Sequence, residues 1–141
     1  MLSRLIYARK AFAKMDYAQL RDINDTSVRI NSTKGVTGLL IYGQSSFLQV
    51  LEGARAEISE TYHRIVQDKR HHELVLIGVS EIAERSFQDW AMRFVMIDGV
   101  NGPKTATLLM KYGVSDQFQP TLFSDSSAHS FLLAHSREFA A

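Results

Sequence analysis

The sequence contains no cysteine and only two prolines among its 141 residues. Without cysteine the chain has no disulfide, no thiol nucleophile and no thiolate ligand for a metal. This composition suits a reducing compartment, so we expect a cytoplasmic protein. No hydrophobic run approaches the roughly 20 residues that span a membrane, and Arg4 interrupts the first apolar stretch, so a signal peptide is not predicted either.

An excess of charge of one sign is also lacking. The chain has 16 basic and 15 acidic residues, a net charge of +1, and no basic cluster. Nucleic acid is therefore not an expected partner. The length predicts one domain with a core of its own, and no internal repeat or metal-binding pattern is present.

Alternation and helical periodicity predict a mixed order of elements. Asp16 and Gln19 have the spacing of a capping box, which favours a helix directly after them. The pattern predicts strands at 2–8, 36–42, 46–52, 74–80 and 92–97, helices at 17–31 and 55–69, and a loop at 9–14. The order βαββαββ indicates an α+β fold, a ferredoxin-like sandwich with two helices on one sheet face.

The second sheet face needs a cover as well. Leu2, Ile6, Leu48 and Val50 alternate onto that face and are apolar, so water is an unfavourable neighbour for them. Two further helices are expected after the last strand, at 103–112 and from about 126, the second with a stripe of Phe131, Leu132, His135 and Phe139. We therefore expect a main domain at 1–98 and a helical extension at 99–141 that covers this face.

Gln49 is an amide between Leu48 and Val50 in a hydrophobic strand. A buried amide without partners costs about 1–3 kcal/mol, so a specific polar partner or ligand is expected. Tyr7, Asn31, Arg64 and Asp68 are predicted to converge on the same gap, between the two helices and above the sheet. Its apolar walls would be Ile23, Ile65 and Phe47. Such a cleft suits a planar heteroaromatic ring with hydrogen-bonding edges.

Four ordered motifs resemble one known family. "RLIY", "GVTGLLIYGQSSFLQVLEG", "TYHRIVQDKRHH" and "IAERSFQDWAM" are similar to the BLUF family, sensors of blue light that use FAD, over about residues 2–97. The tail, with "LLMKY" and "FQP", is similar to that of the short PixD-type members. The resemblance implies a photoreceptor and not an enzyme, with FAD held without a covalent bond.

The resemblance also implies roles for single residues. Tyr7 matches the electron donor, Gln49 the amide that bridges it to the flavin, and Asn31 the group that binds the ring. After photochemistry the Gln49 amide would be rotated or tautomerised. Ile23 and Ile65 would enclose the ring, and Arg64 and Asp68 would address its pyrimidine side. Arg70, His71 and His72 would meet the ribityl and phosphate part. Trp90 and Met92 match the pair linked to signalling, and which of the two faces the flavin stays open.

Two positions depart from the family pattern, and two other functions stay open. Ile30 stands where relatives often carry a polar residue, and Ala91 where serine is frequent. A flavin-free interaction module that forms a dimer or a ring is the main alternative. An acylphosphatase-like enzyme would need a glycine-rich anion loop after the first strand, which "ARKAFAK" lacks. For the photoreceptor we expect a separate downstream signalling protein as partner and a homo-oligomer.

Overall fold

The protein is described here from a computed structural model covering residues 1–11, 14–68, 71–99 and 101–138, without the side chains of His71 and His72. Its strands are β1 (Leu2–Ala11), β2 (Thr37–Gly43), β3 (Ser46–Ala54), β4 (His71–Glu81) and β5 (Arg93–Met96). Its helices are α1 (Tyr17–Lys34), α2 (Arg55–Val66), α3 (Gly102–Tyr112) and α4 (Asp125–Glu138), with a 3₁₀ turn at Pro120–Leu122. None of the helices within the described ranges has the length and apolar character needed to cross a lipid bilayer.

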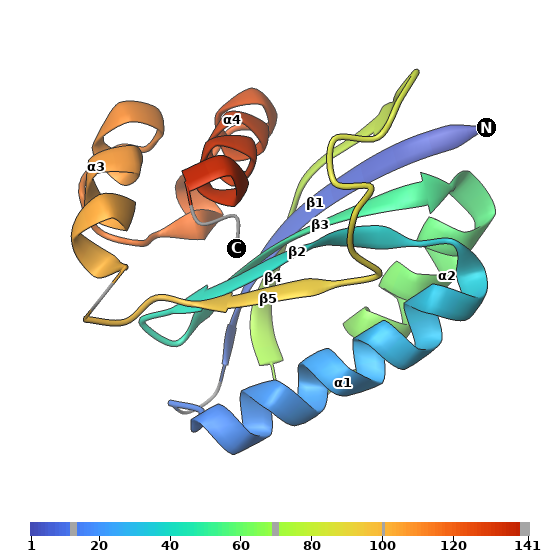
Figure 1. Cartoon of the computed structure of the whole chain (residues 1–141), viewed down its shortest axis with the longest axis horizontal. Coiled ribbons are helices and arrows are strands. Elements are labelled where there is room, and N and C mark those ends of the chain that lie inside the picture. The colour runs from blue at the N-terminus through green and yellow to red at the C-terminus, as the bar shows by residue number, and fades with distance from the viewer. Residues whose placement is uncertain (12–13, 69–70, 100, 139–141) are drawn as a thin grey trace.

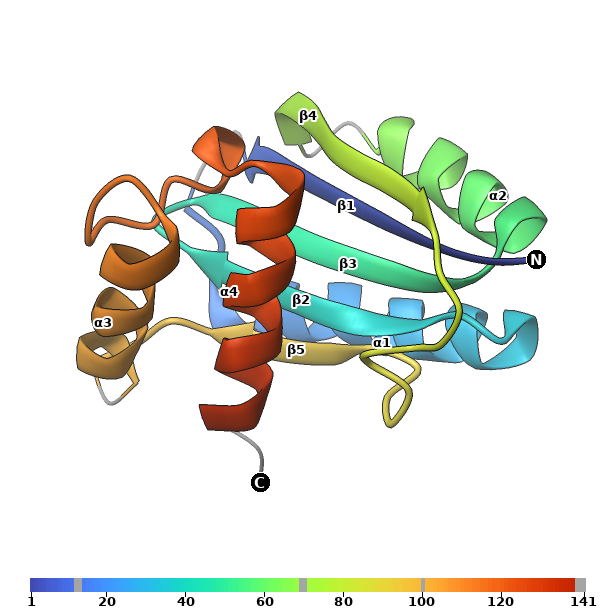
Figure 2. The ribbon, with the colours of Figure 1, turned by 90° about the horizontal axis from the view of Figure 1, so that it is seen from above.

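The strands form a mixed sheet in the order β4-β1-β3-β2-β5 (Figures 1 and 2). β3 lies between β1 and β2 and is antiparallel to both, while β5 is parallel to β2. A strand inserted in this way between the two strands of a βαβ unit is the ferredoxin-like arrangement. The predicted fold class is therefore confirmed.

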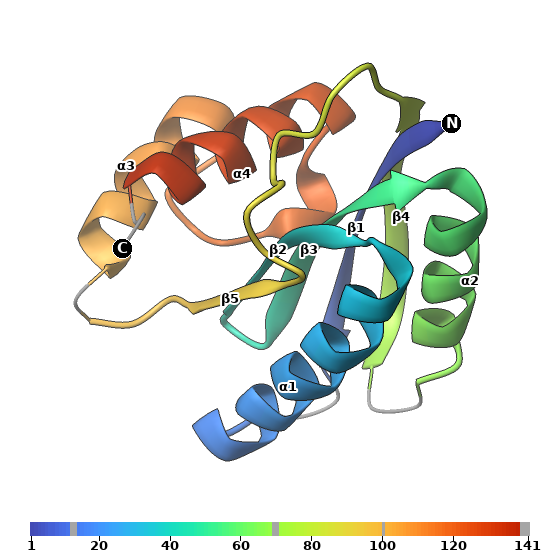
Figure 3. The ribbon, with the colours of Figure 1, turned by 45° about the vertical axis from the view of Figure 1, so that its right-hand side comes forward.

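Helices cover both faces of the sheet, as Figure 3 shows. On the first face, β1, β2 and β3 contribute Leu5, Tyr7, Leu40, Phe47 and Leu51 to one core that α1 and α2 complete. On the second face, the alternate residues of the same strands pack against α3 and α4. Because each strand sends successive side chains to opposite faces, both sets are apolar and both need a cover.

α1 begins after Asp16, as its capping box predicts, and extends three residues further at its C-terminal end than expected. The Asp16 carboxylate accepts a hydrogen bond from the Gln19 backbone N–H, and the Gln19 side chain accepts one from the Asp16 backbone N–H. Gly35 ends the helix in the left-handed conformation, with φ of 66°. Glycine adopts this conformation without the steric cost of a Cβ. The added turn places Asn31 inside the helix, with its side chain buried.

The prediction of a loop at 9–14 was wrong in its first part. Arg9, Lys10 and Ala11 continue β1, because β3 pairs with it as far as Lys10 and β4 as far as Ala11. These are long-range pairings, which local propensity does not reveal. For the same reason β4 begins at His71 and not near residue 74. Residues 12–13 lie outside the described residues.

Two other boundaries differ. α2 ends at Val66, and the Asp68 backbone N–H bonds the Ile65 carbonyl in a turn, so Asp68 follows the helix instead of lying on its last turn. β5 spans only Arg93–Met96, so Trp90 and Met92 precede the regular strand. The predicted hairpin between β2 and β3 is present: Gln44 and Ser45 both have positive φ, which a two-residue type I′ turn requires.

Candidate functional site

A cleft of about 310 Å³ opens between α1 and α2 on the first face of the sheet. This volume lies at the lower end of the range for small-molecule sites. Its lining residues are Arg9, Ile23, Thr26, Ser27, Ile30, Asn31, Gln49, Thr61, Arg64, Ile65, Gln67 and Asp68. A second cleft of about 370 Å³ lies between α2 and β4, but Gln49 and Asn31 do not line it. The first cleft differs from the second because the amides of Asn31 and Gln49 and the charged side chains of Arg64 and Asp68 line it.

Gln49 lies at the base of this cleft and bonds two side chains. Its carbonyl oxygen accepts a hydrogen bond from the Tyr7 hydroxyl, and its Nε2 donates to the Met92 sulfur over 3.3 Å. β1 and β3 set this arrangement, because Tyr7 and Gln49 are direct partners in the antiparallel register. An amide nitrogen carries two hydrogens, so Gln49 has one further donor to offer to a ligand.

Asn31 is the second amide of the cleft and is also buried. Its Nδ2 donates to the Ala91 carbonyl over 3.2 Å, which ties α1 to the segment before β5. Among the described residues nothing donates to its Oδ1, so a ligand N–H is a suitable partner for that oxygen.

Tyr7 is fully buried, and burial raises the pKa of its phenol to about 12. The Arg9 guanidinium opposes this increase, while Tyr62 and Asp68 add to it. The phenol is therefore neutral at physiological pH and is the donor in its hydrogen bond with Gln49.

Most of the predicted site residues meet in this cleft. Ile23 on α1 and Ile65 on α2 face it from either side, and Arg64 and Asp68 stand at its edge. Phe47 differs from the prediction, because its ring is fully buried and does not line the cleft. Arg70 lies outside the described residues, and only the backbone pairing of His71 and His72 with β1 is described.

Met92 and Trp90 are separated by the structure. Met92 is buried and contacts Gln49, whereas the Trp90 ring packs on the Arg93 guanidinium, 4.9 Å from ring centre to Cζ. Sequence alternation places both on one side of a strand, but regular strand structure begins only at Arg93. Gly38 allows the approach of Met92, since a Cβ there would lie 3.3 Å from the Met92 methyl and 2.0 Å from the Val50 carbonyl oxygen.

Sequence reasoning missed two buried polar residues of the cleft, Arg9 and Thr61. Arg9 is 4% exposed, and its Nε has no hydrogen-bond partner among the described residues. The Thr61 hydroxyl of α2 is buried and equally without a partner there. Residues 5, 7, 9 and 11 share one face of β1, but this places Arg9 only once the strand is known to continue past Ala8. Thr61 stands four residues before Ile65, which places both on one face of α2.

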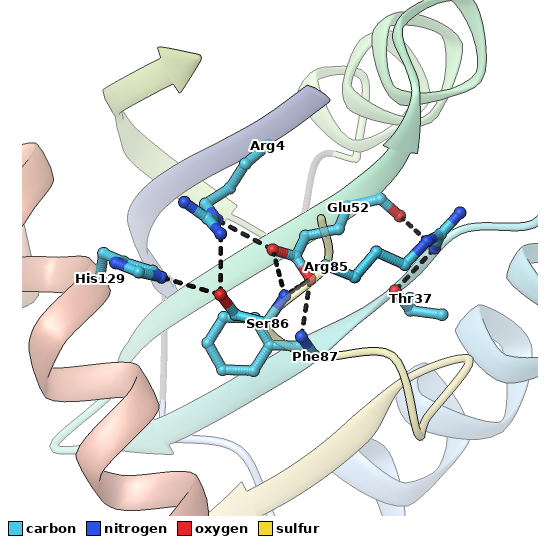
Figure 4. Close-up of polar contacts among 7 residues, drawn as sticks. All are labelled: Arg4, Thr37, Glu52, Arg85, Ser86, Phe87 and His129. Carbon is cyan, nitrogen blue, oxygen red and sulfur yellow. Dashed lines mark hydrogen bonds and ion pairs between the residues drawn. The ribbon is translucent and has the colours of Figure 1, made fainter. Parts of the chain in front are cut away.

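A polar network occupies the opposite end of β3, as Figure 4 shows. The buried Glu52 carboxylate accepts hydrogen bonds from Arg4 Nε at 2.9 Å, from the Ser86 backbone N–H at 2.9 Å and from the Phe87 backbone N–H at 2.7 Å. The Ser86 hydroxyl lies 3.2 Å from His129 Nε2 on α4. The network thus joins β3, the segment that leads to Met92, and α4.

Arg85 connects the segment between β4 and β5 to the end of α1 and the start of β2 through hydrogen bonds. Its guanidinium donates to the Thr37 hydroxyl at 2.8 Å, to the Glu52 carbonyl at 3.1 Å and to the Gly35 carbonyl at 2.8 Å. Figure 4 shows Arg85 and Arg4 on the two sides of Glu52. Three acceptors fix the planar guanidinium, so the connection between β4 and β5 is held in place.

Comparison with known proteins decides the family. The family model described as BLUF, sensors of blue light using FAD, matches residues 2–93. The chain belongs to the BLUF family. It is a blue-light sensor whose cofactor is FAD, as the sequence resemblance predicted.

Individual proteins and solved structures are also similar to this chain. Photoactivated adenylate cyclase subunit beta of Euglena longa is 33% identical over 92 residues, which are 64% of this chain and 11% of that protein. The chain therefore spans about a tenth of the length of the curated relatives first matched. BlsA in its photo-activated state is 29% identical with a TM-score of 0.83, over 94% of this chain and 92% of that one. BlrB in its dark state is 27% identical with a TM-score of 0.75, over 95% and 96%.

The cleft of this BLUF protein fits a flavin. Ile23 and Ile30 of α1 and Ile65 of α2 give it apolar surface on both sides. It also offers the second N–H of Gln49 and the Asn31 oxygen, to which no described residue donates. An isoalloxazine ring presents both N–H and carbonyl groups to such amides. The Thr61 hydroxyl and Arg9 Nε, which have no partner in the part of the chain that the structure describes, are further polar atoms that a bound ring and its chain can satisfy.

Proposed function

We propose that light removes an electron and a proton from Tyr7, that the Gln49 amide is left rotated or tautomerised, and that Met92 carries this change toward the C-terminal helices. The supporting observation is the row of contacts from the Tyr7 hydroxyl through the Gln49 amide to the Met92 sulfur. All three side chains are buried, so a change in one hydrogen bond is not masked by water.

The photochemical step uses the Tyr7 hydrogen bond. When bound, FAD would supply the blue-light absorption and would accept the electron that Tyr7 gives up. An oxidised phenol releases its proton readily, and the Gln49 carbonyl oxygen is the acceptor already in place. When an electron and a proton return to Tyr7, only the Gln49 amide is left changed, either in its orientation or in the position of one of its own protons. A small stored free energy of this kind is lost in the dark.

Met92 responds because its sulfur is an acceptor and has no proton to donate. In the structure Gln49 Nε2 donates to this sulfur. A rotated amide presents its oxygen instead, and a tautomerised amide has one hydrogen fewer on this nitrogen. Either change weakens the contact that holds Met92. The residue stands directly before β5, so its displacement reaches the strand that pairs with β2.

The C-terminal helices are the proposed exit for the signal. Glu52 follows Gln49 by three residues in β3 and holds Ser86, whose hydroxyl contacts His129 on α4. α4 also packs against the second face of the sheet through Phe131 and Leu132. We infer that light changes the surface of this helical extension, which then binds a separate signalling protein.

The experiment illuminates the FAD-loaded wild type and the FAD-loaded Gln49→Leu variant with blue light. The absorption spectrum of the flavin is recorded before and after illumination. The wild type should show a shift of the flavin band to longer wavelength that reverses in the dark. Gln49→Leu should keep the flavin, because leucine fills a similar volume, but should lose the shift. A variant that photocycles like the wild type would show that Gln49 is not the switch. A protein that takes up no FAD would favour the flavin-free interaction module.

A further inference from the structure

Arg9 is a buried cation on the flavin side of β1. It is 4% exposed, and it lines the cleft with Gln49. Its Cζ lies 5.5 Å from the centre of the Tyr7 ring and 5.2 Å from that of the Phe47 ring. The register explains this position, because Arg9 pairs with Phe47 as Tyr7 pairs with Gln49, two residues away on the same face. The guanidinium therefore lies beside the Tyr7 ring and lines the cleft.

The positive charge is not neutralised by the residues described. Arg9 Nε has no hydrogen-bond partner among them, and none of their carboxylates forms an ion pair with Arg9. An arginine cannot lose its charge in a protein, so burial without an anion or acceptor is strongly unfavourable. Two aromatic ring faces stabilise a cation only in part. The arrangement is that of a group awaiting an electron-rich ligand.

We propose that Arg9 is a further residue of the flavin site, donating a charge-assisted hydrogen bond to an acceptor atom of the isoalloxazine ring and stabilising the ring when it gains an electron. This inference rests on the proposed function. The ring carbonyls and unprotonated ring nitrogens are suitable acceptors, and a fixed positive charge favours the more negative, reduced ring. Arg9 also opposes the effect of burial on the pKa of the Tyr7 phenol, so it acts on both partners of the electron transfer.

The test compares Arg9→Met, Arg9→Lys and a matched control, Lys10→Met. Lys10 is the next residue and also carries one positive charge, but it points to solvent and pairs with Glu73. Dissociation constants are measured for FAD and for riboflavin, and the midpoint potential of the bound flavin is measured against a reference dye. Riboflavin lacks phosphate, so it separates a contact with the ring from a contact with the diphosphate.

Arg9→Met should raise the dissociation constants for both FAD and riboflavin by about ten- to a hundredfold, as expected for loss of a hydrogen bond to a charged group. It should also lower the midpoint potential by about 30 mV for each tenfold loss of preference for the two-electron reduced ring. Arg9→Lys should keep most of the potential, because it keeps the charge. Lys10→Met should match the wild type in both quantities.

Stability supplies a readout that does not need the flavin. Without flavin, Arg9→Met should unfold at the same denaturant concentration as the wild type or a higher one, because it removes an uncompensated buried charge. With FAD bound, Arg9→Met should unfold at a lower denaturant concentration than the wild type. If Arg9→Met does not fold, Arg9→Lys and Arg9→Gln provide the same comparison.

Two results would overturn the role of Arg9. One is an Arg9→Met protein with wild-type dissociation constants and potential, and the other is a loss of affinity seen with FAD but not with riboflavin. Both leave the proposed function standing, provided the wild type still shows its light-induced shift. A wild type that binds no flavin would instead remove the proposed function itself.

Discussion

At the scale of single residues, burial keeps the Tyr7 phenol able to donate. Its pKa is raised, so it stays protonated, and in this structure it donates to the Gln49 carbonyl. The amide nitrogen is thereby directed to Met92. A neutral phenol can also accept a hydrogen bond, so it remains a partner for a rotated Gln49 amide.

Tyr7→Phe should keep FAD but lose the light-induced shift, because phenylalanine fills the same space and has no proton to give to Gln49. The measurement is the absorption spectrum before and after blue light. Tyr42→Phe is the matched control, since Tyr42 is also a buried phenol of this core but bonds the Met15 backbone N–H at 3.1 Å. A full shift in Tyr7→Phe would assign the electron donor to another residue.

His135 gives a pH dependence of stability. It is fully buried on α4, beside Thr105 and Phe131, and burial together with Arg93 lowers the pKa of its imidazole to about 4. The unfolded chain binds this proton near its ordinary pKa of 6.5, and the folded protein only near 4. Between these values the unfolded state holds more protons, so stability falls as the pH falls.

The expected loss from His135 is about 2 kcal/mol between pH 7.5 and pH 5, measured by urea unfolding. His135→Gln should flatten this dependence, because glutamine can still bond the Thr105 hydroxyl and does not titrate. His63→Gln, which changes an exposed histidine of α2, should leave the pH dependence as it is. A His135→Gln protein with the full wild-type slope would assign the titration to other groups.

At the scale of elements, the connection between β4 and β5 is irregular but firmly held. Glu52 accepts from Arg4, Ser86 and Phe87 at one end, and Gln49 and Asn31 hold the segment near Met92 at the other. These hydrogen bonds explain how a segment without regular structure can keep Met92 against Gln49. β3 supplies both Glu52 and Gln49, so one strand contributes to both ends of the connection.

Glu52→Gln should lower the free energy of unfolding by about 2–4 kcal/mol, because an amide nitrogen would face donors that now share a buried carboxylate. Chemical denaturation measures this loss. Glu138→Gln is the matched control: Glu138 also forms an ion pair, with Lys104, but both residues are exposed, so the change should stay within about 0.5 kcal/mol. A Glu52→Gln protein as stable as the control would mean that the network contributes no net stability.

The elements also show which features the sequence could reveal. Local signals were sufficient for α1, with its capping box, and for the β2–β3 turn. They failed for Arg9, because β1 continues there only through pairing with β3 and β4. They failed for Trp90 as well, because alternation was extended beyond the start of β5. Ile23, Asn31 and Gln49 lie on regular elements and line the cleft where the sequence placed them, since their faces follow from periodicity.

At the scale of the whole molecule, the C-terminal helices and the sheet share one core. Ile6, Leu39, Leu48 and Val50 of the sheet are all buried in the cluster that Phe131 and Leu132 of α4 complete. The flavin cleft uses the first face of the same strands. The same strands therefore contribute to both cores, and we propose that residues 99–141 form a cap that cannot be separated without loss of stability.

Phe131→Ala in the full chain tests that proposal. The Phe131 ring is fully buried and stacks on Phe123 at 5.2 Å, so its removal should leave a cavity and lower the free energy of unfolding by about 3–5 kcal/mol. Met110→Ala on α3, where the side chain is 64% exposed, should change it little. FAD should still bind to Phe131→Ala, because the cleft is on the other face. A loss below about 1 kcal/mol would mean that the extension is only loosely attached, and the route from Gln49 to α4 would then need a different path.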